Sequence, residues 1–198
     1  MTGSGTSAPD YERLLSDVQW AKRQQFSARE LAPMLERLIA VAPPQARECL
    51  YAKLELAELT VAEKPFRAAL LAREVLRNTE DDRAFGVLGL AHTLLGNYRA
   101  AVRAYRQAIA MAPRCPSYRH NLGHLLDLVF DQPAQALVHL EVAHCELGDE
   151  AEIASSYAHA LLRAGFAERA ADILTAALGA RAAGVLESWR GSSARTAD

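Results

Sequence analysis

An all-α fold is what the sequence predicts: a right-handed superhelix (α-solenoid) of antiparallel helix pairs. Hydrophobic residues occupy 51% of the 198 positions, and there are 11 glycines and 8 prolines, so helices can form and bury a core. Apolar residues recur at helical spacing, and helix-stop signals divide them into segments of helical length. The same small and large residues recur at steps of 34 or 35 residues, which is typical of a repeat fold.

The clearest repeat covers residues 82–115. It contains two predicted helices joined at Gly96-Asn97, because glycine favours a helix end and a turn. Pro113 ends the second helix, since proline lacks the backbone N–H that a helix interior needs. The same pattern predicts two further repeats over residues 116–150 and 151–184.

Two sets of anchor residues define this repeat. In the first helices, Leu88-Gly89 recurs as Leu122-Gly123 and then as Tyr157-Ala158, at steps of 34 and 35 residues. In the second helices the steps are 35 and 34 residues, which places one extra residue in the turn 130–133. The second-helix anchors are Ala101, Tyr105 and Ala108; then Ala136, Leu140 and Ala143; then Ala170, Leu174 and Ala177. Small residues at matching positions let the two helices of each repeat approach closely.

This pattern resembles the tetratricopeptide repeat signature. The residues that carry the resemblance are Phe85, Leu88, Gly89, Ala101, Tyr105, Ala108 and Pro113. The later repeats depart from it, with Arg119 and Ala154 at aromatic positions and Gly148 and Ala182 in place of the closing proline. The resemblance implies a protein-binding array in which the first helices of successive repeats line a concave groove.

Residues 10–81 are predicted to form further helices before these repeats. One helix extends to Gln25, and a second begins at a capping box formed by Ser27 and Glu30 and ends before Pro43-Pro44. A degenerate helical repeat follows, in which residues 45–62 and 65–77 form a pair across a turn at Glu63-Lys64.

The two ends of the chain are predicted to differ from the repeats. Residues 181–190 are expected to form a capping helix that covers the exposed end of the array. Residues 1–9 and 191–198 are small and polar, and we expect them to be disordered.

Composition argues against several function classes. The 22 basic and 24 acidic residues nearly balance, so no basic field is present to attract nucleic acid. No apolar run has the length of roughly 20 residues that membrane insertion requires, and no secretory signal is recognisable. Three widely spaced cysteines favour a reducing compartment, so a cytoplasmic location is expected.

The residues expected to face the groove are the candidate binding residues. In each first helix these residues form a stripe beside the packing anchors. An extended peptide, or a helix with one apolar anchor and a polar flank, would suit this surface. They are Arg83, Val87, Leu90 and Leu94; then His120, Asn121, His124, Asp127 and Leu128; then Ser156, His159, Leu162 and Arg163. A subset of the family clamps a C-terminal carboxylate, but Gly86, Leu90, Glu152 and Ser156 depart from that clamp and only Asn121 matches it.

The sequence thus predicts a non-catalytic adaptor or scaffold that binds a protein or peptide and needs no cofactor. Two alternative functions remain open. His120, His124 and His159 are weak candidates for a metal site in a His-lined metal- or ligand-binding regulatory module. No further ligand or HExxH motif completes that set, so we favour hydrogen-bonding groove residues. The layout is also loosely similar to bacterial type III secretion class II chaperones, which implies a dedicated cytosolic chaperone and a homodimer through the N-terminal helices.

Catalysis is the function that the sequence favours least. Ser155-Ser156 precedes His159 on one predicted helix, but a helix interior has no free backbone N–H to stabilise an oxyanion. The sequence therefore predicts that the chain is not an enzyme.

Overall fold

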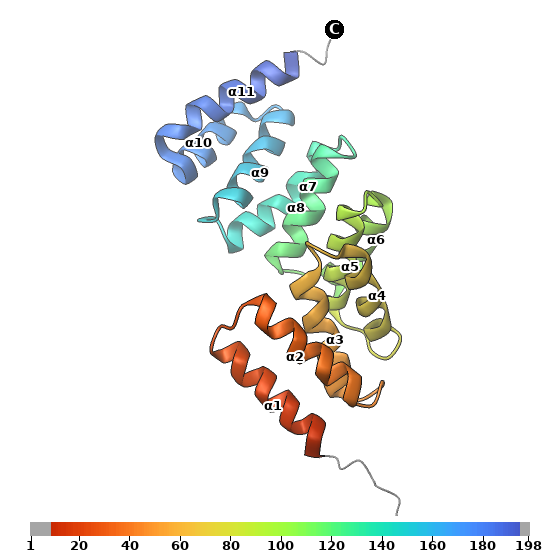
Figure 1. Ribbon diagram of the computed structural model, residues 1–198. Coiled ribbons are helices and arrows are strands. Elements are labelled where there is room, and N and C mark those ends of the chain that lie inside the picture. Colours follow the sequence, from red (N-terminus) through yellow and green to blue (C-terminus); the bar gives the residue numbers. More distant parts are fainter. Residues whose placement is uncertain (1–8, 195–198) are drawn as a thin grey trace, which may run out of the picture. The chain divides into compact units, whose positions relative to one another are not determined.

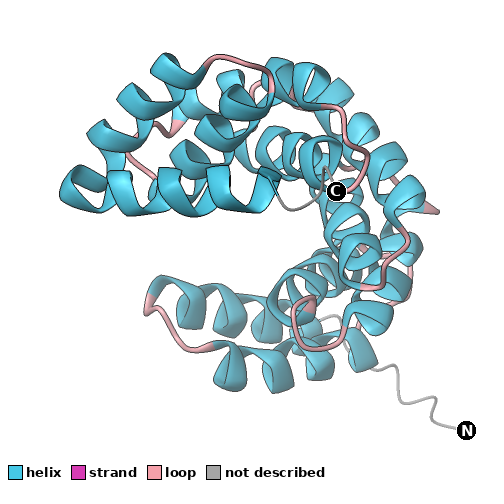
Figure 2. Cartoon of the chain, turned by 90° about the horizontal axis from the view of Figure 1, so that it is seen from above, coloured by secondary structure: helices cyan, strands magenta, loops and turns pink. Residues whose placement is uncertain are grey.

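A computed structural model of the chain describes residues 9–194, which consist of helices and connecting loops (Figures 1 and 2). The chain divides after Ala104, within α6, into two compact units. The helices are α1 (Pro9–Arg23), α2 (Ala28–Val41), α3 (Arg47–Thr60), α4 (Pro65–Leu76), α5 (Asp82–Leu94), α6 (Tyr98–Met111), α7 (Pro116–Leu128), α8 (Pro133–Glu146), α9 (Ala151–Arg163), α10 (Ala167–Leu178), the 3-10 helix η1 (Gly179–Arg181) and α11 (Ala182–Ala194).

The first unit, residues 9–104, contains α1 to α5 and the beginning of α6, and each of α1 to α4 packs on the next helix (Figure 1). The predicted capping box at the start of α2 is confirmed. The Ser27 backbone N–H and hydroxyl both donate to the Glu30 carboxylate, at 2.9 and 2.6 Å. In α4 the anchors Ala68, Ala72 and Val75 are buried in one apolar core with residues of α3 and α5. The small residues of α4 therefore let its neighbours approach closely.

The second unit, residues 105–194, contains the end of α6 and the helices α7 to α11. Successive helices from α7 to α11 pack on one another, and α7 also packs on α9. Residues 129–132 connect α7 to α8, whereas three-residue loops, 95–97 and 164–166, follow α5 and α9. The longer loop is the predicted site of the extra residue. Its Asp131 has φ 54°, a left-handed conformation that aspartate adopts more readily than most residues.

A glycine sets the distance between α7 and α8. A Cβ atom at Gly123 would lie 2.6 Å from Cγ of Leu140 and 3.2 Å from the carbonyl oxygen of Ala136. Leu140 is fully buried, so its side chain has little room to move away. The sequence prediction that small residues lie where the paired helices meet is confirmed at this position.

The C-terminal helix corrects one prediction. The sequence predicted disorder from residue 191, but α11 continues to Ala194, so residues 191–194 are helical. A single 3-10 turn, η1, separates α10 from α11 and begins at Gly179, whose φ of 57° lies in the left-handed region. Residues 1–8 and 195–198, which include most of the predicted disordered termini, lie outside the described part of the chain.

The predicted all-α fold of antiparallel helix pairs is confirmed. Within residues 9–194, no helix is long and apolar enough to cross a membrane. Cys49, Cys115 and Cys145 are free thiols in this structure.

Candidate functional site

The second unit contains a pocket of about 290 Å³, which we call the α9 pocket. Side chains from α7, α9 and α11 line it. The lining residues are His124, Asp127, Leu128, Glu152, Ser155, Ser156, His159 and Trp189. Five of these eight were predicted as groove residues, namely His124, Asp127, Leu128, Ser156 and His159. The structure thus brings together the polar stripes of two successive first helices.

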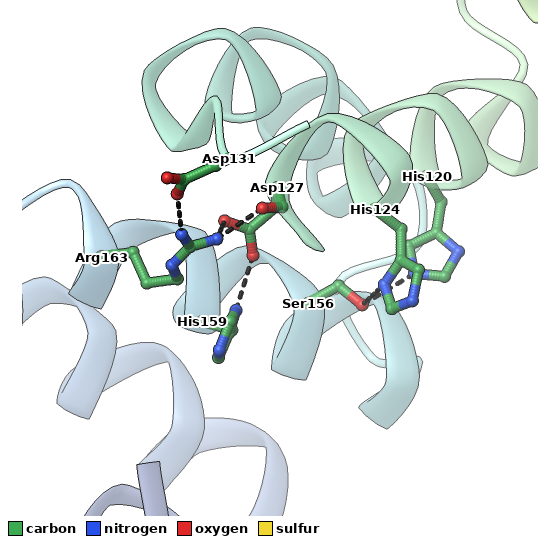
Figure 3. Close-up of polar contacts among 7 residues, drawn as sticks. All are labelled: His120, His124, Asp127, Asp131, Ser156, His159 and Arg163. Carbon is green, nitrogen blue, oxygen red and sulfur yellow. Dashed lines mark hydrogen bonds and ion pairs between the residues drawn. The ribbon is translucent and has the colours of Figure 1, made fainter. Parts of the chain in front are cut away.

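A buried carboxylate connects the two helices that form this pocket (Figure 3). The Asp127 side chain on α7 is 3% exposed, and it lies 2.5 Å from Nδ1 of His159 and 2.7 Å from Nη1 of Arg163 on α9. Arg163 also donates to the backbone carbonyl of Asp127 and forms an ion pair with Asp131. Burying a carboxylate without such partners is energetically costly. Arg163, predicted as a binding residue, therefore orders the wall of the pocket.

Two histidines of α7 share one hydroxyl group of α9 (Figure 3). The Ser156 hydroxyl lies 2.9 Å from Nε2 of His120 and 3.4 Å from Nδ1 of His124. One hydroxyl proton allows Ser156 to donate to one ring while accepting from the other. These contacts fix the orientation of both rings. His120 is buried beneath them, whereas His124 is exposed in the pocket.

Burial affects the protonation of His120. It lowers the pKa of the imidazole below its ordinary value near 6.5, and the adjacent His124 contributes in the same direction. Glu152 opposes these effects without overcoming them. Burial, followed by neighbouring arginines, also lowers the pKa values of His92 and His139.

These pKa shifts predict that acid destabilises the fold. The unfolded chain takes up protons at His120, His92 and His139 as the pH falls through about 6.5, whereas the folded protein keeps these rings neutral to lower pH. The free energy of unfolding should therefore be highest above that pH, where the histidines are neutral in both states. It should decrease as the pH falls towards the lowered pKa values. Urea denaturation at pH 7.5, 6.5 and 5.5 measures this slope. We expect His120→Gln to make it shallower, and an unchanged slope would contradict the assignment to His120.

Trp189 is a pocket residue that the sequence did not reveal. It lies on α11, and its ring meets that of His159 edge to face, with centroids 5.0 Å apart and an interplanar angle of 83°. The sequence predicted α11 as a capping helix, but helical periodicity does not state which neighbour a side chain reaches. Trp189 can be identified as a pocket residue only when the packing of α11 on α10 is known.

The four groove residues predicted in α5 have different environments in the first unit. Arg83 pairs with Glu58 and, at 2.7 Å, with the buried Glu55, which also pairs with Lys22. Burial opposes ionisation of Glu55, but hydrogen bonds from Arg83 and Lys22 outweigh it and lower the pKa. Arg83, predicted as a groove residue, thus joins α5 to α3 through ion pairs.

The prediction for Val87 is corrected by the structure. Its side chain is 5% exposed and lies in the core with residues of α3 and α4, because α5 packs on both of these helices. Leu90 is partly buried against the same core, whereas Leu94 is 50% exposed. Of the apolar patch predicted in α5, Leu94 is the residue most available to a partner.

The remaining predicted residues lie on α7 and α9 but do not line the α9 pocket. Asn121 and Leu162 are partly exposed on α7 and α9, outside the pocket lining. The three histidines proposed as metal ligands do not converge, since His120 and His124 contact Ser156 while His159 contacts Asp127. Among the side chains of residues 10–189, no group of three His, Cys, Asp or Glu residues is arranged to hold a metal ion.

No protein-family model and no curated protein matches the chain. Its fold is similar to that of the MamA protein, with a TM-score of 0.66, 18% identity, and coverage of 87% of this chain and 92% of that chain. The MamA RS-1 ArsTM double mutant gives a TM-score of 0.68 at 15% identity, covering 94% and 98%. YrrB, described as a TPR protein with an unusual peptide-binding site, gives 0.67 at 13% identity, covering 92% of each chain. The chain therefore has a tetratricopeptide-type fold.

Proposed function

We propose that this protein is a non-catalytic adaptor that binds a peptide segment of a partner protein in the α9 pocket. The observation that carries the proposal is the convergence of five predicted groove residues around one pocket of about 290 Å³. Ligand pockets are concave and place a few polar groups among apolar ones, as Ser156, Glu152 and Leu128 do here. The peptide-binding site ascribed to YrrB, which has a similar fold, supports the same class of function.

The surroundings of the serines favour binding over catalysis. The Ser155 hydroxyl donates to the carbonyl oxygen of Ala151 at 2.6 Å, and Ser156 is held by two histidines. Both serines lie inside α9, where backbone N–H groups form the bonds of the helix and cannot stabilise an oxyanion. A serine nucleophile at this place would lack the groups that acyl transfer needs.

Occluding the pocket tests the proposal. The 198-residue chain is applied to an array of random 12-residue peptides, and the peptides that it binds are identified. We expect Ser155→Tyr, which adds a ring inside the pocket, to weaken their binding by about tenfold or more. Thr175→Tyr, which adds the same ring on the exposed face of α10, should leave binding unchanged.

A second occluding variant, together with a test of folding, shows whether lost binding comes from misfolding. His124→Tyr fills the pocket from α7 instead of α9, and thermal unfolding of each variant shows whether the fold is retained. The proposal is wrong if the array yields no bound peptide, or if both folded pocket variants bind the same peptides as strongly as the wild type.

A further inference from the structure

The α9 pocket has an excess of negative charge. Asp127 and Asp131 both form ion pairs with Arg163, and no other arginine or lysine among the described side chains pairs with either carboxylate. The two carboxylates and the guanidinium together carry one net negative charge. Glu152 lines the same pocket and adds a second. Among the side chains that the structure describes, none forms an ion pair with Glu152. An anionic ligand would be repelled, and a cation would gain a partner.

An apolar wall lies beside this charge. Leu128 is 52% exposed and lines the pocket together with the indole of Trp189. Lysine and arginine side chains bury their methylene stems along such surfaces while the charged end reaches a polar partner. An aromatic ring also attracts a nearby cation. The volume of about 290 Å³ suits one long side chain better than a large ligand.

We propose that the α9 pocket receives a lysine or arginine side chain of the bound segment. Its stem lies beside Trp189, and its cation is directed towards Glu152. This inference rests on the proposed function and adds the chemistry of the partner, a basic peptide segment. Asp127 contributes to the field, but its carboxylate is already held by His159 and Arg163. Glu152 is thus the residue that selects the charge of the ligand.

Three short peptides test this selection on the 198-residue chain. They are acetyl-Gly-Ala-X-Ala-Gly-amide with X as lysine, norleucine or glutamate, so that the first two share an unbranched alkyl stem and differ in charge. The Trp20→Phe substitution leaves Trp189 as the single tryptophan, and NMR then follows its indole N–H during titration. We expect the lysine peptide to bind about threefold more tightly than the norleucine peptide, because Glu152 is exposed and water screens the new ion pair. The glutamate peptide should bind more weakly than either.

Removing one carboxylate completes the test. Glu152→Gln should weaken the lysine peptide by about threefold and abolish its advantage over norleucine. Glu168→Gln removes the same charge from an exposed position on α10 and should leave both affinities unchanged. Equal binding of the lysine and norleucine peptides, or no effect of Glu152→Gln, would overturn the inference.

The two proposals fail in different ways. Peptides from the random array that lose binding on Ser155→Tyr support the α9 pocket as a peptide site whatever their charge. If those peptides lack enrichment in lysine and arginine, the choice of ligand is wrong while the binding function stands. If no array peptide depends on the pocket, the proposed function itself is wrong.

Discussion

Replacing Asp127 with alanine should lower the free energy of unfolding by roughly 3 kcal/mol, because it removes one member of a buried ion pair and leaves the others without their partner. The Asp127 side chain is 3% exposed, whereas those of Arg163 and His159 are 29% and 24% exposed. Water can reach part of the two partners, which places the cost towards the lower end of the range for buried pairs. Urea denaturation followed by circular dichroism measures the loss.

Asp131 provides a matched control for this change. It pairs with the same guanidinium of Arg163, but its side chain is 85% exposed. Exposed ion pairs contribute little, so Asp131→Asn should cost less than about 1 kcal/mol. Asparagine removes the charge and, like aspartate, tolerates the left-handed backbone at this position. Equal losses for Asp127→Ala and Asp131→Asn would contradict the view that burial gives Asp127 its importance.

Enlarging Gly123 should also destabilise the protein strongly. We expect Gly123→Val to cost about 3 kcal/mol, because a side chain there overlaps Leu140 and approaches the carbonyl of Ala136. Replacing the glycine improves helix propensity by less than about 1 kcal/mol, which does not offset the overlap. Thermal and urea unfolding of the variant measure the effect.

Two further variants separate packing from propensity. Gly184 lies on α11 with no atom within 4 Å of a Cβ placed there, so Gly184→Val should change stability by less than about 0.5 kcal/mol. Leu140→Ala opens space opposite Gly123 and should cost about 3 kcal/mol alone. The Gly123→Val/Leu140→Ala double variant should lose less than the sum of the single losses. Additive losses would show that the two positions do not compete for the same space.

Local signals in the sequence predicted much of this fold. The capping box of Ser27 and Glu30, the glycine turn at Gly96 and the extra residue in the loop 129–132 depend on neighbouring residues alone. Helical spacing also identified one face of α7 and one of α9, and these faces meet at the α9 pocket. Each of these predictions needs only the geometry of a single helix or of a repeated pair.

Features that depend on a third helix were harder to predict. Val87 lies on the expected stripe of α5, but α3 and α4 both pack on this helix and cover it. Trp189 enters the α9 pocket because α11 folds back over α10 and contacts His159. The ion pair between Asp127 and Arg163 spans two repeats, so spacing showed the residues without showing that they are partners.

The Asp127 contacts limit how this array can be lengthened by duplication. A tandem copy of residues 116–150 inserted after the original would place the duplicate of His124 where His159 now meets Asp127, since the two positions correspond. The duplicate of Leu128 would replace Arg163, and the original Asp127 would be buried without a permanent cation. A lineage that gained a repeat at this junction would need a compensating arginine at once. Growth of the array by copying is therefore disfavoured between α8 and α9.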